Sequence, residues 1–261
     1  MLSKHFKRNE HLLDTCRRRK PSPLRTFLCW AGLVPLLLGA ALLLYCAGVV
    51  VKARRATPAI MAAALSPEKA LIKPGELPRR RLDQLLKVED PDFLGHKGVD
   101  LKTPGAGLTT ITQAVVKIFY FDDFKPGLAK LKQTLIARFA VHPLVSKQDQ
   151  LTLLLNYAYL GNCRGVPVRG FAAAAECYYG RRFDRLREDE YLSLVALLVA
   201  PDTFSPVLNP QANKDRVERI KKLVAGEYTP RHHMDIYYGP LDPRTQTALA
   251  PASYLPGIYE N

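Results

Sequence analysis

The stretch that decides the fold of this chain is EDPDFLGHKG at residues 89–98. Asp90 is a favourable helix N-cap and Pro91 suits the first position of a helix, so the sequence predicts that a short helix begins here. Glu89 would then lie beside a helix start. A purely structural role for Glu89 is one interpretation of that position, because the helix dipole favours a carboxylate there.

A second piece, GLTTITQAVVK at residues 107–117, follows closely. Thr109, Gln113 and Lys117 are four residues apart each time, so they fall on one face of a helix predicted over 109–120. A stripe of hydroxyl, amide and ammonium groups is therefore expected to face the Glu89 carboxylate.

An uncharged segment precedes these two pieces. The chain has 261 residues, 48% of them hydrophobic, which is enough for one sizeable domain and an anchor. Residues 27–51 carry no charged side chain, and at about 1.5 Å per residue they can cross a hydrocarbon core of roughly 30 Å. The sequence predicts one transmembrane signal-anchor helix here. A cleaved signal peptide is the alternative, although the apolar run is longer than such peptides need.

The net charge of +14 is concentrated in part at the N-terminus, where residues 1–26 hold eight Lys or Arg against two acidic residues. The positive-inside rule predicts that this basic tail is cytoplasmic and that the main domain lies outside. Next to a spanning helix, basic residues act as a topology signal or contact anionic lipid, so no nucleic-acid partner is expected. Cys163 and Cys177 fall on the outer side, where a disulfide is permitted, but their spacing leaves the pairing open.

The rest of the chain divides by composition. Residues 52–80 hold several prolines and predict a connector with at most one short helix near 59–65. Residues 81–225 predict a mainly α domain, with helical periodicity over 109–120, 126–140, 147–159, 168–179, 187–199 and 211–225. Residues 226–261 are rich in Pro and Tyr and predict either an extended strap on the domain or a disordered tail.

The two opening pieces resemble the first two motifs of the family-51 glycosyltransferases, the peptidoglycan transglycosylases, which read EDxxFxxHxG and GGSTITQQxxKN. The first motif matches at every fixed position: Glu89, Asp90, Phe93, His96 and Gly98. The second keeps a subset of its residues: Thr110, Ile111, Thr112, Gln113 and Lys117.

The resemblance extends over roughly residues 80–210. The family's third motif, RKxxE, is similar to the stretch around Lys130, with Ala129 at the Arg position and Gln133 at the Glu position. SKQDQLTLLLNYAYLG at 146–161 resembles the fourth motif. GFAAAAECYYGRR at 170–182 and EYLSLVALLVAPDTFSP at 190–206 look like two later family stretches.

The resemblance implies a lysozyme-like helical domain with a small jaw lobe, and an enzyme of the bacterial cytoplasmic (inner) membrane. It would polymerise a lipid-linked disaccharide (lipid II) into glycan chains, with cell-wall synthesis proteins as further candidate partners. Glu89 would be the general base. Substrate would be bound or framed by further residues at the positions of the first three motifs: Asp90, Phe93, His96, Thr109, Thr110, Gln113, Lys117, Lys130 and Gln133. Lys117 and Lys130 would hold the donor diphosphate.

Departures from the family pattern keep two other hypotheses open. Gln133 and Ala129 replace a charged pair, so no cofactor is certain, and a divalent cation such as Mg or Mn is only an open option at this position. The linker between the first two motifs, residues 99–106, is short. A catalytically degenerate relative that binds precursor or scaffolds a wall-synthesis complex is the main alternative. A lysozyme-like cleaving enzyme is less favoured, since no second carboxylate is placed to pair with Glu89.

Overall fold

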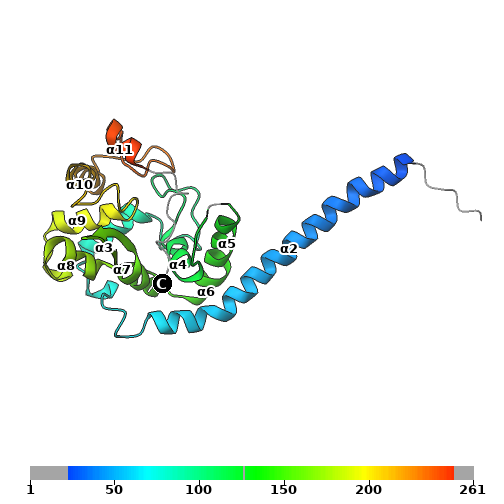
Figure 1. Cartoon of the computed structure of the whole chain (residues 1–261), viewed down its shortest axis with the longest axis horizontal. Helices are drawn as coiled ribbons and strands as arrows, with labels where there is room; N and C mark the ends of the chain where they lie inside the picture. The colour runs from blue at the N-terminus through cyan, green and yellow to red at the C-terminus, as the bar shows by residue number, and fades with distance from the viewer. Residues whose placement is uncertain (1–22, 126, 250–261) are drawn as a thin grey trace, which may run out of the picture. The chain divides into compact units, whose positions relative to one another are not determined.

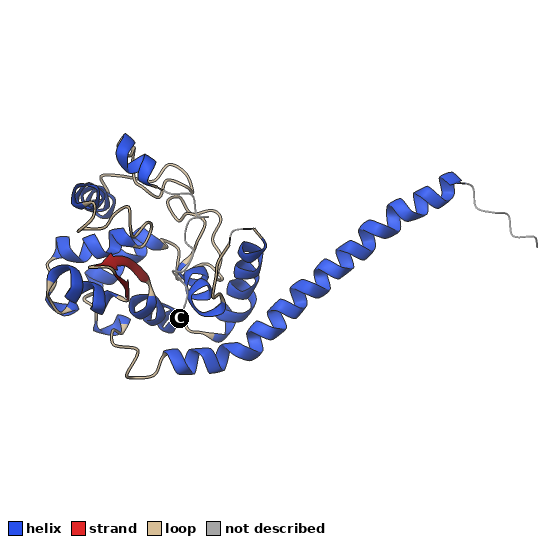
Figure 2. Cartoon of the chain, in the orientation of Figure 1, coloured by secondary structure: helices blue, strands red, loops and turns tan. Residues whose placement is uncertain are grey.

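The computed structural model describes residues 23–125 and 127–249, and Figure 2 shows that nearly all of the regular structure is helical. The mainly α prediction is confirmed. After the long helix α2 (Pro23–Ala64), the helices are α3 (Arg79–Glu89), α4 (Ile111–Tyr120), α5 (Leu128–Ile136), α6 (His142–Leu144), α7 (Lys147–Tyr157), α8 (Phe171–Tyr179), α9 (Glu188–Leu197), α10 (Pro210–Ala225) and α11 (Pro243–Ala248). Shorter 3-10 or π turns are η3 (Pro74–Glu76), η4 (Ala137–Val141) and η5 (Phe183–Arg185). The helices predicted over 109–120, 187–199 and 211–225 are present as α4, α9 and α10.

Helix α2 contains the predicted span but continues well beyond it. From Trp30 onward it holds a stretch that is long and apolar enough to cross a membrane, judged by length and composition. The prediction of a connector over residues 52–80 with at most one short helix near 59–65 was wrong for its first part, because α2 runs through Pro58 to Ala64. The reason is tertiary packing: Ala53, Thr57 and Met61, four residues apart, are buried on one face. The calls for residues 1–22 and 250–261 lie outside the described residues.

Two clusters of buried apolar residues form the core of the folded unit, which begins at Gly48. The larger joins α3, α7, α8, α9 and α10, and Figure 1 shows α3, α7, α8 and α9 gathered together. The smaller joins the end of α2 with α4 and η4. Helix α4 belongs to both, since Ile111 lies in the larger cluster and Val115 in the smaller. The helix of the second motif is therefore fixed from two sides.

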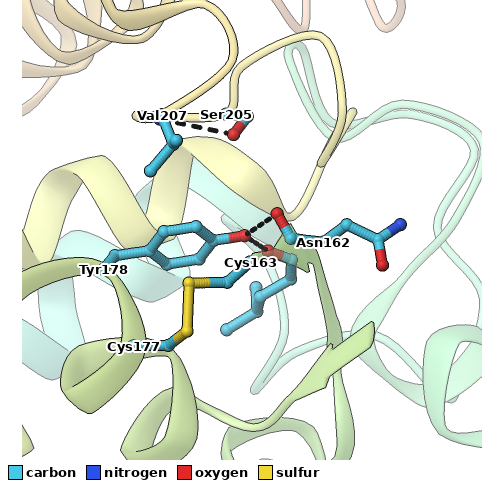
Figure 3. The surroundings of a disulfide bond; sticks show 7 residues. Asn162, Cys163, Cys177, Tyr178, Ser205 and Val207 are labelled. Carbon is cyan, nitrogen blue, oxygen red and sulfur yellow. Dashed lines mark hydrogen bonds between the residues drawn. A yellow bond between two sulfur atoms is a disulfide. The ribbon is translucent and has the colours of Figure 1, made fainter. Parts of the chain in front are cut away.

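A β-hairpin interrupts the helices, in a region that the sequence predicted as the ends of two of them. Strands β1 (Tyr159–Cys163) and β2 (Val166–Arg169) pair antiparallel around a two-residue turn. The turn residues Arg164 and Gly165 have φ of 55° and 82°, as tight hairpins require. A disulfide joins Cys163 of β1 to Cys177 of α8, and Tyr178 donates from its hydroxyl to the hairpin carbonyls of Leu160 and Asn162 (Figure 3).

Residues 226–249, here called the strap, fold back over the domain after α10 (Figure 1, brown to red). The backbone N–H groups of Gly105 and Gly107 donate to the carbonyls of His232 and His233, at 3.0 and 2.9 Å. Of the two alternatives left open for this segment, the extended strap is the one observed for its described part. The strap thus packs along the short linker between the first two motifs.

Candidate active site

Glu89 is the last residue of α3, and Asp90 is the C-cap of that helix. The prediction of a helix beginning after Asp90 was therefore wrong. The Asp90 carboxylate does not cap the residues that follow it in sequence, because it accepts instead from the backbone N–H of Ile111 at 2.9 Å, at the start of α4. Residues 91–98 consequently form a chain of turns, and Glu89 lies at the negative end of a helix dipole.

The Glu89 side chain is half-buried, and its position disfavours negative charge. Burial raises the pKa of Glu89 to about 7, the positive charge of Arg216 opposes that rise, and the neighbouring Asp90 adds to it. A carboxyl group that titrates near neutral pH can both take up and release a proton under physiological conditions. Glu89 is therefore suited chemically to general acid–base work.

A buried network fixes the loop after Glu89. His96 Nδ1 accepts from the Gly98 N–H at 3.0 Å, so this nitrogen carries no proton and the other ring nitrogen, Nε2, donates to Asp90 at 2.9 Å. Gly98 has φ of 91°, and a Cβ there would lie 2.6 Å from the Ala137 carbonyl oxygen. The spacing of the residues in this motif thus corresponds to one hydrogen-bonded loop closed by a glycine.

The loop is tied to the second motif through Thr110. Its hydroxyl donates to the Gly98 carbonyl at 2.9 Å, and it forms a capping box with Gln113 at the start of α4. Gln113 also donates to Thr134 of α5 at 3.1 Å. The side chains of Thr110 and Gln113 are buried and form internal hydrogen bonds, while Thr109 is exposed.

Lys117 and Lys130 bring positive charge to the same end of the site. Lys130 Nζ donates to the Leu108 carbonyl at 2.7 Å and to Thr109 Oγ1 at 3.1 Å. Burial, together with the charge of Lys117, lowers the pKa of Lys130 to about 8. Burial also lowers the pKa of Lys117, whose ammonium lies 5.1 Å from the centroid of the Phe124 ring. Both ammonium groups therefore lie where burial penalises positive charge, a cost that an anion bound beside them would offset.

Gln133 does not supply a metal-binding group. Its Nε2 donates to the Gln113 carbonyl at 2.8 Å, and its Oε1 is buried without a partner among the described residues. Divalent cations such as Mg²⁺ and Mn²⁺ take carboxylate oxygens in preference to a single amide. Residues 23–125 and 127–249 hold no group of three or more His, Cys, Asp or Glu that could bind a metal ion. The residues at this position therefore do not fit a divalent cation.

Comparison with known proteins agrees with this arrangement. The family model described as Transglycosylase matches residues 59–225, which is more than half of the chain. The chain belongs to the transglycosylase family. The matched residues run from the last two turns of α2 to the end of α10, so they include Glu89 as well as Lys117 and Lys130.

The relatives of this chain include long and short proteins. It is 32% identical over 158 residues to penicillin-binding protein 1F of Bacillus subtilis, covering 56% of this chain and 21% of that protein. It is 29% identical over 169 residues to penicillin-binding protein 1A of Pseudomonas aeruginosa, covering 58% and 20%. A "putative transglycosylase" of Cupriavidus necator is 29% identical over 223 residues, covering 76% of this chain and 94% of that protein. The chain thus spans about a fifth of the two penicillin-binding proteins and nearly all of the third relative.

The structure adds Lys147 to the residues expected from sequence. Its ammonium lies 4.1 Å from the centroid of the buried Phe93 ring and donates to the His96 carbonyl at 3.2 Å. The signal was present in the sequence, because Lys147 stands at the Lys of the fourth motif. The Phe93 ring therefore packs against the ammonium of Lys147 and against the His96 ring, with 6.1 Å between the two ring centroids.

Arg216 of α10 and Tyr238 of the strap were also missed. Arg216 is fully buried, and its charge acts on Glu89. Tyr238 donates from its hydroxyl to the carbonyl of Val88, at 2.7 Å. Nothing in the sequence marked them, since an Arg on an amphipathic helix is usually solvated and a Tyr in a Pro-rich tail has no periodic pattern.

Proposed function

We propose that this transglycosylase is a peptidoglycan glycosyltransferase that joins lipid-linked disaccharide units (lipid II) into glycan strands. The observation that carries the proposal is Glu89, a half-buried carboxyl group at the end of α3 whose pKa is raised to about 7 by burial. A general base works best when its pKa lies near the working pH. The family membership supplies the reaction class, and Glu89 supplies the group that activates the acceptor.

In the proposed reaction the 4-hydroxyl of one disaccharide attacks the anomeric carbon of the growing chain. Glu89 takes the proton of that hydroxyl as the new C–O bond forms. The bond from the anomeric carbon to the diphosphate oxygen breaks, and undecaprenyl diphosphate leaves with the electron pair. The base and the leaving-group site must then lie on opposite sides of the anomeric carbon.

The leaving diphosphate is assigned to Lys117 and Lys130. Each ammonium has a lowered pKa, and for Lys130 the charge of Lys117 is one of the causes. A bound diphosphate would relieve that repulsion and would accept charge-assisted hydrogen bonds from both. Thr109, exposed and hydrogen-bonded to Lys130, is proposed to line the same position.

The remaining predicted site residues are proposed to shape this site from within. Asp90 and His96 hold the loop that carries Glu89, while Thr110 and Gln113 join that loop to α4. Gln133 holds the carbonyl of Gln113. No step of the proposed reaction requires a metal ion.

A single-pass location in the cytoplasmic membrane is proposed, with α2 as the span, the N-terminus inside and the domain outside. The apolar stretch of α2 supports the span. The Cys163–Cys177 disulfide supports the outer location of the domain, since disulfides persist in oxidising compartments. Anchoring also places the site close to a substrate that carries its own lipid.

A second candidate function is that of a scaffold or precursor-binding protein. Gln133 and Ala129 favour it, because the family's Arg and Glu at these positions are replaced by uncharged side chains. A scaffold would keep the anion site of Lys117 and Lys130 and would bind lipid II without joining it.

The two functions are separated by incubating the purified full chain in detergent with lipid II. We expect glycan strands and released undecaprenyl diphosphate from the parent, and strongly reduced product from a Lys117→Ala/Lys130→Ala variant. Lys125→Ala is the matched control, because this exposed lysine pairs with Asp123 outside the motifs and should leave the rate unchanged. Lipid II binding without any product would favour the scaffold and overturn the enzymatic proposal.

A further inference from the structure

Arg216, deeply buried in α10, is surrounded by aromatic rings beside the end of α3. Its side chain is 1% exposed. The guanidinium carbon lies 4.6 Å from the centroid of the Tyr238 ring, and 5.9 Å from those of Phe204 and Tyr237. Aromatic faces attract a cation, but a buried charge also requires a partner of opposite sign.

Some hydrogen-bond donors of Arg216 have no acceptor in the described part of the domain. Its Nε and Nη1 are buried and have no hydrogen-bond partner among residues 23–125 and 127–249. Among the carboxylates of that described part, Glu89 is the one whose charge acts on Arg216. The guanidinium is therefore the counter-charge of the Glu89 carboxylate.

Tyr238 connects this cation to the backbone that carries Glu89. Its hydroxyl donates to the carbonyl of Val88, the residue before Glu89, at 2.7 Å. Its φ of 58° lies in the left-handed region, which a non-glycine residue keeps only where surrounding contacts determine it. Such contacts are present, because the strap pairs with the linker at Gly105 and Gly107 just before this tyrosine.

We propose that Arg216 and Tyr238 are positioning residues for Glu89, with Arg216 supplying the buried counter-charge and Tyr238 fixing the end of α3. The strap segment that contributes Tyr238 lies beyond the residues matched by the family model. The inference rests on the proposed function, in which Glu89 is the base.

The charged or titratable groups that face Glu89 come from three elements. They are Arg216 of α10, Asp90 at the end of α3, and Tyr238 of the strap. Helix α9 also packs on α3, but no charge of its described residues acts on Glu89. Removing Arg216 therefore leaves Asp90 as the only full charge facing Glu89 in the described part of the chain, and both Asp90 and burial favour the protonated acid.

The kinetic test follows kcat/KM for lipid II against pH. Arg216→Met should move the acid limb upward by about one pH unit and lower the rate at pH 7 about fivefold, with the KM for lipid II little changed. Arg216→Lys should restore the position of the limb in part. Arg219→Met is the control, because Arg219 lies on the same helix and no charge of Glu89 acts on it.

Tyr238→Phe keeps the ring beside Arg216 and removes the hydroxyl, which donates to the Val88 carbonyl and accepts from Arg216. We expect kcat to fall by about three- to tenfold, since a small displacement of a catalytic group is costly. Tyr228→Phe is the control in the same strap, because its hydroxyl donates to Asp235 at 2.7 Å. Kinetics equal to the parent for both Arg216→Met and Tyr238→Phe would overturn the positioning role.

A double-mutant cycle based on melting temperatures tests the pairing of Arg216 with Glu89 without an activity assay. At pH 8, Arg216→Met should lower the Tm more in the parent than in a Glu89→Gln background, and this coupling should vanish at pH 5, where Glu89 is protonated. If the Arg216 and Glu89 substitutions change the Tm independently at pH 8, the inference is overturned. If the two substitutions are coupled at pH 8 but the parent protein makes no glycan, the proposed function is overturned while the charge pair of Arg216 and Glu89 is retained.

Discussion

The rate of glycan synthesis should depend on pH, with Glu89 determining the fall on the acid side and Lys130 the fall on the alkaline side. Glu89 must be unprotonated to act as a base, so activity falls as the pH drops through its pKa of about 7. Lys130 must be protonated to hold the diphosphate, so activity falls as the pH rises through its pKa of about 8. A bell-shaped profile of kcat/KM with a maximum near pH 7.5 is expected.

The size of the effect follows from the two pKa values. About 60% of the enzyme has both groups in the active state at pH 7.5, and about 3% at pH 5.5, so kcat/KM should fall about 20-fold between them. With the ordinary pKa of 4.5 for Glu89, the acid side would lose only about a tenth of the activity at pH 5.5.

The assay is the initial rate at low lipid II concentration in detergent, in buffers of constant ionic strength. Lys130→Arg is the matched variant, because arginine stays charged across the range and should flatten the alkaline limb while leaving the acid limb in place. A parent profile that is flat between pH 5.5 and 7.5 would refute the assignment of Glu89 as a base with a raised pKa.

Three further predictions concern the diphosphate site, Gln133 and the membrane. Lys117→Ala and Lys130→Ala should each weaken binding of donor or of a diphosphate-mimicking inhibitor by about 1.5–3 kcal/mol by calorimetry, and unchanged binding in both would return these lysines to a solvent-facing role. Gln133→Glu should lower the free energy of unfolding by about 1–3 kcal/mol relative to Gln133→Met, since a carboxylate oxygen would face the Gln113 carbonyl 2.8 Å away; an equal or higher Tm would count against this. Thiol-reactive labelling of a cysteine introduced on the surface of the main domain should place that domain outside the cytoplasmic membrane, because its own Cys163 and Cys177 are joined in a disulfide. Labelling of that cysteine from the cytoplasm would exclude the whole account.

Much of the helical domain could be predicted because its sequence is locally consistent. The capping pair Thr110 and Gln113 specifies the start of α4 without reference to other elements, and Thr109, expected on the same helix, lies just before that start. The hairpin was missed because its two strands are four and five residues long, too short for a periodic signal. Its Arg164–Gly165 turn was the available indication.

The position of Glu89 was misjudged for a non-local reason. Asp90 and Pro91 have the local chemistry of a helix start, but the Asp90 carboxylate caps α4, 21 residues later in the chain. The extension of α2 past Pro58 and the folding of the strap have the same origin, since both depend on burial against distant elements. Arg216 and Tyr238 belong to this class, because no short-range pattern places them beside Glu89.

The measurement that tests the central claim most directly is lipid II polymerisation by Glu89→Gln compared with the parent, in the same detergent at pH 7.5. We predict a loss of about 10²–10⁴-fold, the usual contribution of general-base catalysis. The Tm at pH 8 should stay close to that of the parent, because glutamine removes the cost of the buried carboxylate but leaves Arg216 without its counter-charge. Because the pKa of Glu89 is raised in the folded protein, the contribution of this residue to folding stability is fully present below about pH 4.5. That contribution is lost as the pH rises through about 7, a loss that glutamine avoids. A folded Glu89→Gln protein that polymerises lipid II as fast as the parent would contradict the account.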